Sequence, residues 1–385
     1  MGRKTKTKLP DLVIVLDFGG SLTKVIFRGR DRNPQVLCME PEAIGLPKSA
    51  ITNYERQSMG MSALAPADRA WVGVGDQYYA LGYLARTQFF GNPGLTQLKY
   101  ERAFPKVLAA VWAAATSLGL KDEFTASIGI LLPPGEYKNG ENLQHLLKKG
   151  LREFETPTGT LKVTLTHYDC KPEGGGVYLV HTANWDWAAQ KNKVLAVLMV
   201  GYRNASVLVV QRGAVIKRST SELGFIQLVN SVKAKTSGLD VNQLAEAIAL
   251  GGDPPDPKIL SRCLMSVGDV QRRNELSALR QAVISSREQY SLSLKSWLRE
   301  ELPRLVDEVL LCGGTSEYLR PELSEHFSSS KIVWHGVELP PSLASSELGN
   351  RLCDVYSMYE YFLVRVARGE CSVSPTQQEA VAVNG

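Results

Sequence analysis

The stretch LDFGGSLTK, residues 16–24, decides how the rest of this sequence is interpreted. It follows an apolar run, residues 12–15, that predicts a buried strand. Gly19 and Gly20 then indicate a tight turn, because glycine takes backbone conformations that other side chains forbid. A plain β-turn between two strands is therefore the simplest interpretation of the two glycines.

A plain turn does not explain why an acid, two hydroxyls and an ammonium accompany the glycines, at Asp17, Ser21, Thr23 and Lys24. A phosphate site accounts for all four. Glycines let backbone N–H groups approach phosphate oxygens, the hydroxyls and the ammonium add donors, and a carboxylate can hold a hydrated Mg²⁺. The motif is short, so the plain turn stays open as the alternative.

Length and composition indicate a globular protein of two domains. A chain of 385 residues is too long for one ordinary core. Its apolar share of 44% and charged share of 22% are typical of soluble proteins. No apolar run approaches the roughly 20 residues that a spanning helix needs. The net charge of +5 is mild, and part of it lies in the leader MGRKTKTK, which is either a solvated terminus or a contact for nucleic acid or an acidic surface.

Cysteine usage favours a reducing compartment. The six cysteines lie far apart, and no CxxC pair occurs among them. They therefore read as reduced thiols of a cytoplasmic protein rather than as a metal or disulfide set.

The first half of the chain reads as strands and helices after the opening motif. Residues 24–29 predict a second strand, which completes a hairpin around the glycine turn. Residues 31–100 look irregular, apart from a hairpin at 71–82. An alanine-rich helix is expected at 101–118, with Pro105 tolerable only in its first turn. A buried strand at 126–137 is stopped by a pair of prolines.

The second half restarts this pattern. Residues 194–210 again give strand, glycine turn and strand. Aligned by their glycines, the two hairpins place Met199 where the first has Asp17. A long helix at 270–302 and a strand at 306–314, which ends in Gly-Gly, follow. Two related α/β halves, each offering a strand–turn–strand to a shared cleft, are the duplication expected of a nucleotide clamp.

This order of turns resembles the actin/DnaK/sugar-kinase ATPase superfamily. Within it, the chain is most similar to the actin-like plasmid-segregation ATPases of the ParM/StbA type, over roughly residues 12–365. Besides the opening loop, the matching segments are LPPGEY (132–137), PEGGGVYLV (172–180), VGYRNASVLVV (200–210), ELGFIQLV (222–229), LCGGTSEYL (311–319) and GNRLCDVYSMY (349–359).

The resemblance implies an α/β fold with two actin-like (ribonuclease H-like) domains that flank a nucleotide cleft. Domain I would span 10–193, with an inserted small subdomain at about 31–100. Domain II would span 194–340, and 341–368 would form a helix that returns to domain I. Residues 369–385 are small and polar and predict a disordered tail.

The resemblance also implies ATP and Mg²⁺ as cofactors. Asp17 would hold Mg²⁺ through water, Lys24 would neutralise phosphate charge, and Glu173 would orient the attacking water as the catalytic residue. The plainer alternatives are a turn former for Asp17 and a surface carboxylate for Glu173, while Glu136 is expected to be structural. The implied nucleotide-binding residues are Asp17, Gly19, Gly20, Ser21, Thr23, Lys24, Gly201, Arg203, Asn204, Gly224, Gly313, Gly314 and Thr315.

One position departs from the family pattern. The second phosphate loop of the superfamily begins with an acidic residue, where this chain has Met199. Losing that carboxylate removes one anchor for Mg²⁺ or its water shell, which predicts slow hydrolysis. Arg203, inside the same loop, would either pair with phosphate oxygens or point outward.

Three functions follow from the resemblance. The first is a filament-forming ATPase that polymerises head to tail, coupled to DNA through a DNA-binding adaptor, with no sequence-specific DNA contact of its own. The second is a static cytoskeletal filament that turns ATP over slowly. The third is a small-molecule kinase of the same superfamily, which needs an aspartate base. Its candidate, Asp76 after Gly75, looks like a hairpin turn instead.

Overall fold

The computed structural model describes residues 9–30, 32–58 and 64–373, and the chain divides into two compact units. Unit 1 joins Met1–Val180 to Leu339–Gly385, and unit 2 is His181–Glu338. Unit 2 therefore begins at His181, whereas the resemblance implied that domain II starts at residue 194. The leader 1–8 and the tail after 373 lie outside the described residues.

Unit 1 is built on a nine-stranded sheet with the order β3-β2-β1-β7-β9-β8-β5-β6-β4. The strands are β1 (Leu12–Phe18), β2 (Thr23–Gly29), β3 (Gln35–Met39), β4 (Ala43–Leu46), β5 (Trp71–Val74), β6 (Gln77–Leu81), β7 (Glu123–Leu132), β8 (Phe154–Thr156) and β9 (Gly159–Pro172). Strands β1, β2 and β3 form an antiparallel meander, and β1, β7 and β9 run parallel. The expected hairpin around the glycine turn is confirmed.

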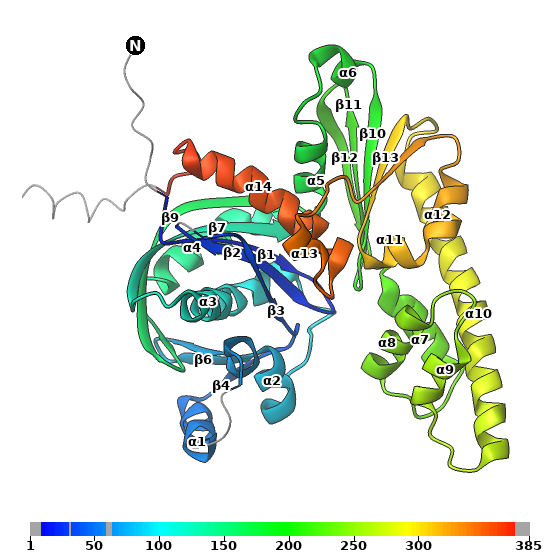
Figure 1. Cartoon of the computed structure of the whole chain (residues 1–385), viewed down its shortest axis with the longest axis horizontal. Coiled ribbons are helices and arrows are strands. Elements are labelled where there is room, and N and C mark those ends of the chain that lie inside the picture. Colours follow the sequence, from blue (N-terminus) through cyan, green and yellow to red (C-terminus); the bar gives the residue numbers. More distant parts are fainter. Residues whose placement is uncertain (1–8, 31, 59–63, 374–385) are drawn as a thin grey trace, which may run out of the picture. The chain divides into compact units, whose positions relative to one another are not determined.

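The helices of unit 1 include members on both faces of the central strands of this sheet (Figure 1). They are α1 (Lys48–Ser58), α2 (Gly82–Phe89), α3 (Lys99–Leu118), α4 (Gly140–Gly150), α5 (Gly175–His181), α13 (Pro341–Ala344) and α14 (Cys353–Ala367), with 3-10 turns η1 (Pro66–Arg69), η2 (Tyr137–Asn139) and η4 (Gly349–Leu352). All seven residues of β1 are buried because α3 and α14 pack against β1 from opposite faces.

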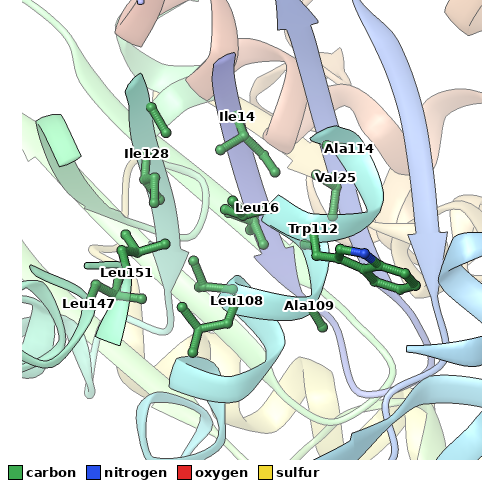
Figure 2. Packing of buried hydrophobic residues seen from close by; sticks show 14 of the residues in the cluster. Ile14, Leu16, Val25, Leu108, Ala109, Trp112, Ala114, Ile128, Leu147 and Leu151 are labelled. Carbon is green, nitrogen blue, oxygen red and sulfur yellow. The ribbon is translucent and has the colours of Figure 1, made fainter. Parts of the chain in front are cut away.

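Side chains of β1 alternate between two cores. Ile14 and Leu16 join the core that α3 covers, where Trp112 and Leu108 pack against them (Figure 2). Val13 and Val15 join the second core, which α14 lines with Met358, Tyr359 and Phe362. The end of β1, where the candidate site begins, is therefore fixed from both sides.

The region 31–100 is more regular than its sequence predicts. Strand β6 pairs with β5 on one side and with β4 on the other, and α1 and α2 accompany these strands. The hairpin expected at 71–82 is confirmed as β5 and β6, and Gly75 in its turn has φ 57°. Residues 59–63 of this region lie outside the described part.

The expectation for Pro105 is wrong. Helix α3 begins at Lys99, so Pro105 lies in its second turn rather than its first. The cost of the missing N–H is offset by an alanine-rich helix whose residues from Val107 to Ala115 are all buried.

The segment after unit 2 returns to the sheet of unit 1. Helix α14 covers β1 and β7 on the face opposite α3. The first residues of the expected disordered tail instead pair with β9. Ser372 forms a bridge with His167, and the N–H of Val373 donates to the carbonyl of Thr166 at 2.9 Å. Backbone hydrogen bonds to β9 therefore hold residues 372 and 373, which the composition of this segment did not predict.

Unit 2 contains a five-stranded sheet with the order β12-β11-β10-β13-β14. Its elements are α6 (Trp187–Lys191), β10 (Val194–Val200), β11 (Ala205–Gln211), β12 (Ala214–Ser221), α7 (Phe225–Ala234), α8 (Val241–Gly251), α9 (Pro257–Leu260), η3 (Ser261–Cys263), α10 (Asp269–Glu301), β13 (Glu308–Cys312), α11 (Gly314–Tyr318), α12 (Arg320–His326) and β14 (Lys331–Trp334). The long helix expected at 270–302 is α10, and it packs on α7.

The two sheets repeat one plan. Strands β12-β11-β10-β13-β14 match β3-β2-β1-β7-β9 in order and direction, with three antiparallel strands followed by two parallel ones. The register agrees as well. Asp17 lies opposite Lys24 in the first hairpin, and Met199 lies opposite Ser206 in the second. The duplication expected from the sequence is therefore present, and Met199 is the counterpart of Asp17.

No described helix combines the length and the apolar character that crossing a membrane requires.

Candidate functional site

The candidate site of unit 1 lies where three parallel strands end. Because β1, β7 and β9 run parallel, their carboxyl ends meet at one edge of the sheet, which is where open α/β sheets place ligands. Asp17 is opposite Leu131 at this edge. The N–H of Glu173, directly after β9, donates to the carbonyl of Leu132 at 2.8 Å. Two residues that are far apart in the sequence are thus brought to one edge.

Asp17 is held as an anion by surrounding cations. It is 6% exposed and forms an ion pair with Lys24 across the hairpin. Burial alone would raise the pKa of Asp17, but the charges of Lys24, Lys99 and Arg351 hold that pKa below its usual range. A buried carboxylate that stays ionised is suited to an electrostatic role.

The turn between β1 and β2 needs glycine for its own geometry. A Cβ on Gly19 would lie 2.5 Å from the carbonyl oxygen of Leu22, which is backbone and cannot move aside. Gly20 and Ser21 are half-buried. Thr23 is 1% exposed, and its hydroxyl is without a hydrogen-bond partner among the described residues. A phosphate could therefore reach Gly20 and Ser21 directly, whereas Thr23 would require local opening.

Glu173 is bound by a lysine that the sequence did not single out. Lys99, the first residue of α3, forms an ion pair with Glu173, and both side chains are 8% exposed. The position of Lys99 is set by Glu136, whose carboxylate accepts the N–H of Tyr100 at 3.0 Å. Glu136 thus has the structural role expected of it, because it satisfies a free N–H at the start of α3. Glu173 is not a surface carboxylate.

A second carboxyl, Asp354 in α14, holds the residue after Glu173. The N–H of Gly174 donates to Asp354 Oδ2 at 2.9 Å, and Gly174 has φ 79°. Burial, and then the neighbouring charge of Asp17, raises the pKa of Asp354 to about 8. Its Oδ1 is buried and lacks a hydrogen-bond partner in the described chain. Asp354 therefore fixes the backbone that carries Glu173.

Arg351 also reaches the turn from the C-terminal segment. It lies in η4, is exposed, and donates from Nη2 to Ser21 Oγ at 3.3 Å. The expected residues Asp17, Gly19, Gly20, Ser21, Thr23, Lys24 and Glu173 are thus gathered in unit 1, and Lys99, Arg351 and Asp354 join them.

The expected residues of unit 2 gather around the β10–β11 turn. The carbonyl of Gly201 accepts the hydroxyl of Thr315 at 2.9 Å and the N–H of Phe225 at 3.1 Å. A Cβ on Gly224 would lie 2.1 Å from the carbonyl carbon of Arg203 and 2.4 Å from the nitrogen of Asn204. Only glycine at 224 lets α7 dock this closely against the turn.

Gly313, directly after β13, lets the chain pack closely against the end of β10. Its φ is 96°, and a Cβ there would lie 2.3 Å from the carbonyl oxygen of Val200. The same Cβ would be 3.1 Å from the sulfur of Met199, so a thioether occupies the place that holds a carboxylate in the first hairpin. Gly314, at the start of α11, is exposed. The turn of unit 2 is consequently built by backbone contacts rather than by ion pairs.

Arg203 and Asn204 lie differently in this turn. Arg203 is half-buried and forms no ion pair within the described part of the chain, whereas Asn204 is 8% exposed. The carbonyl of Asn204 accepts the N–H of Gly201 at 3.0 Å and closes the turn.

Comparison with solved structures identifies the fold. The chain superposes on the ParM of a 15-stranded filament from Clostridium botulinum with a TM-score of 0.60 at 14% identity, covering 92% of this chain and 99% of that one. An archaeal actin homolog gives 0.59 at 17% identity, with 91% and 99% covered. Bacillus thuringiensis ParM with ATP gives 0.56 at 12% identity, with 94% and 100% covered. No protein-family model and no curated protein matches the sequence.

These likenesses extend over nearly the whole of each chain, and the repeated sheet plan accounts for them. The protein therefore has the two-domain α/β fold of actin-like proteins of the ParM type.

Proposed function

We propose that this protein is an actin-like filament protein that binds ATP with Mg²⁺ and hydrolyses it slowly. The observation that carries the proposal is the charged edge of unit 1. Lys24, Lys99 and Arg351 surround the glycine turn there, beside the buried anion Asp17. Phosphoryl transfer asks a protein mainly for positioning and for this kind of electrostatic stabilisation.

The residues suit the two cofactors. Mg²⁺ keeps several waters and binds through one or two carboxylates together with substrate phosphates, so the single carboxylate of Asp17 is sufficient. Bound Mg²⁺ would supply charge neutralisation at the phosphates. The Gly20–Ser21 backbone and Lys24 would contact phosphate, and the Gly313–Thr315 loop of unit 2 would contact the nucleoside.

Glu173 would accept a proton from, or orient, the attacking water. It can do so only when Lys99 does not occupy its carboxylate, because a lone pair engaged by an ammonium is a weak acceptor. Met199 gives a second reason for slow turnover, since the second hairpin offers a thioether where the first offers Asp17.

Filament formation is supported by the fold likeness to ParM proteins, one of which is described as a 15-stranded filament. Head-to-tail contacts that do not close into a ring generate such open polymers. We further propose that the filament acts in the cytoplasm in DNA segregation, through a DNA-binding adaptor, or as a cytoskeletal element. A kinase is disfavoured, because Asp76 lies in the exposed turn between β5 and β6.

Calorimetry with Mg-ATP, followed by sedimentation with ATP, with ADP and without nucleotide, tests the proposal. We expect saturable binding and ATP-dependent pelleting above a critical concentration. Bound nucleotide should also raise thermal stability, by about 2.7 kcal/mol at a hundredfold excess over Kd. Absence of binding at millimolar ATP would remove the proposal, whereas binding without pelleting would favour the kinase.

A further inference from the structure

We infer that Arg351 is a phosphate-binding residue of the β1–β2 turn, contributed by the segment that follows unit 2. This inference rests on the proposed ATP binding and adds to it a residue that the opening motif does not contain. Arg351 and Ser21 are separated by 330 positions in the sequence, yet their side chains form a hydrogen bond of 3.3 Å.

Charge pairing around the turn distinguishes Arg351 from the two lysines. Lys24 is paired with Asp17, and Lys99 is paired with Glu173. Within the described residues, Arg351 forms no ion pair, and its guanidinium donates to the neutral hydroxyl of Ser21. Of these three cations, Arg351 is therefore the one that no described carboxylate pairs.

The backbone of Arg351 is fixed while its side chain stays accessible. Leu352, the next residue, is fully buried in the core between β1 and α14, and the N–H of Arg351 donates to the carbonyl of Leu348 at 3.0 Å. Arg351 itself is exposed. The backbone position therefore keeps the guanidinium near the turn, and its planar fork fits two oxygens of one phosphate.

The electrostatic surroundings agree with this geometry. Arg351 is one of three cations that hold the pKa of Asp17 low, so its charge is felt at the end of β1. With Arg351, the three cations outnumber the two paired acids, Asp17 and Glu173, because the pKa of Asp354, raised to about 8, leaves that third carboxyl largely protonated at pH 7. A polyanion at the turn would restore balance there.

The test compares Arg351→Met, Arg351→Lys and the control Arg32→Met by calorimetry with Mg-ATP at two salt concentrations. Arg32 is also exposed, but it follows the opposite end of β2. We expect Arg351→Met to weaken ATP binding by about tenfold or more and to reduce its salt dependence, as loss of a hydrogen bond to a charged group should. Arg351→Lys should recover part of the affinity, and Arg32→Met should match wild type.

The outcomes separate this inference from the proposed function. If wild type does not bind Mg-ATP, the proposed function fails. If wild type binds and Arg351→Met binds equally with the same salt dependence, only the inference is overturned. Should Arg351→Met lower the unfolding temperature, Arg351→Lys decides. A folded lysine variant that binds Mg-ATP more tightly than Arg351→Met supports a charge role. A folded lysine variant that binds Mg-ATP as weakly as Arg351→Met contradicts it.

Discussion

The ion pair between Lys99 and Glu173 gives the sharpest prediction about stability. Lys99→Met keeps the aliphatic stem but leaves the carboxylate of Glu173 without its cation, in a position where both side chains are 8% exposed. Breaking a buried pair by removing one partner costs about 3–5 kcal/mol, because the remaining charge is uncompensated. For a unit of this size, that corresponds to a fall of roughly 6–20 °C in the unfolding temperature.

The assay is thermal unfolding, with urea unfolding as a second measurement. Lys99→Met combined with Glu173→Gln should recover most of the loss, since replacing both charges of a buried pair is often nearly neutral. Lys48→Met is the control, because Lys48 pairs with Glu155 at the surface, where the side chains are 62% and 41% exposed. Its removal should change the unfolding temperature little. Equal shifts for Lys99→Met and Lys48→Met, or no recovery in the double variant, would refute the reasoning.

Three further variants probe the rest of the site. Asp354→Asn should stabilise the protein against thermal unfolding more at pH 7.5 than at pH 4.5. The pKa of Asp354 is raised to about 8 in the folded protein, so ionisation of this carboxyl in the unfolded chain lowers the stability of the wild type increasingly between about pH 4 and pH 8. The amide of asparagine removes this penalty, and its oxygen still accepts the N–H of Gly174. Equal stabilisation at both pH values would contradict this. Gly224→Ala should destabilise the protein by about 1–3 kcal/mol in urea unfolding and weaken ATP binding, because the added Cβ would meet the backbone of Arg203. The control Gly251→Ala should be tolerated, because a Cβ there would lie 3.6 Å from its nearest neighbouring atom. Met199→Asp should speed phosphate release in an ATPase assay, and an unchanged rate would show that the missing carboxylate does not limit turnover.

The hairpins and the duplication could be predicted from sequence because their signals are local. An apolar run, a glycine pair and a second run define β1 and β2 over eighteen residues, from Leu12 to Gly29. The same local pattern gives β10 and β11, and the register then places Met199 at the position of Asp17. Helix α10 was also predictable, since its pattern is long and is stopped by Pro303.

The remaining site residues carry no local signal. Lys99 is a lysine at the start of an alanine-rich helix, and nothing near it in the sequence points to Glu173, which lies 74 positions away. Asp354 is bound to Gly174 across 180 positions. Such pairs depend on where whole elements pack, so only the tertiary structure reveals them. The strands β3 and β4 were missed because they are short, and β4 in addition pairs with β6 rather than with the strand before or after it in the sequence.

The discontinuity of unit 1 has a consequence for biosynthesis. Unit 2 is one uninterrupted segment, so its sheet can complete as soon as residue 338 leaves the ribosome. Unit 1 begins earlier in the chain but lacks α14, and therefore one covering face of β1, until the segment after 339 is made. Arg351 and Asp354 arrive with that same segment. A nascent chain would thus lack the Arg351 contact to phosphate, and the Asp354 contact that fixes Gly174, until translation has passed α14, which delays completion of the site and any nucleotide-dependent assembly.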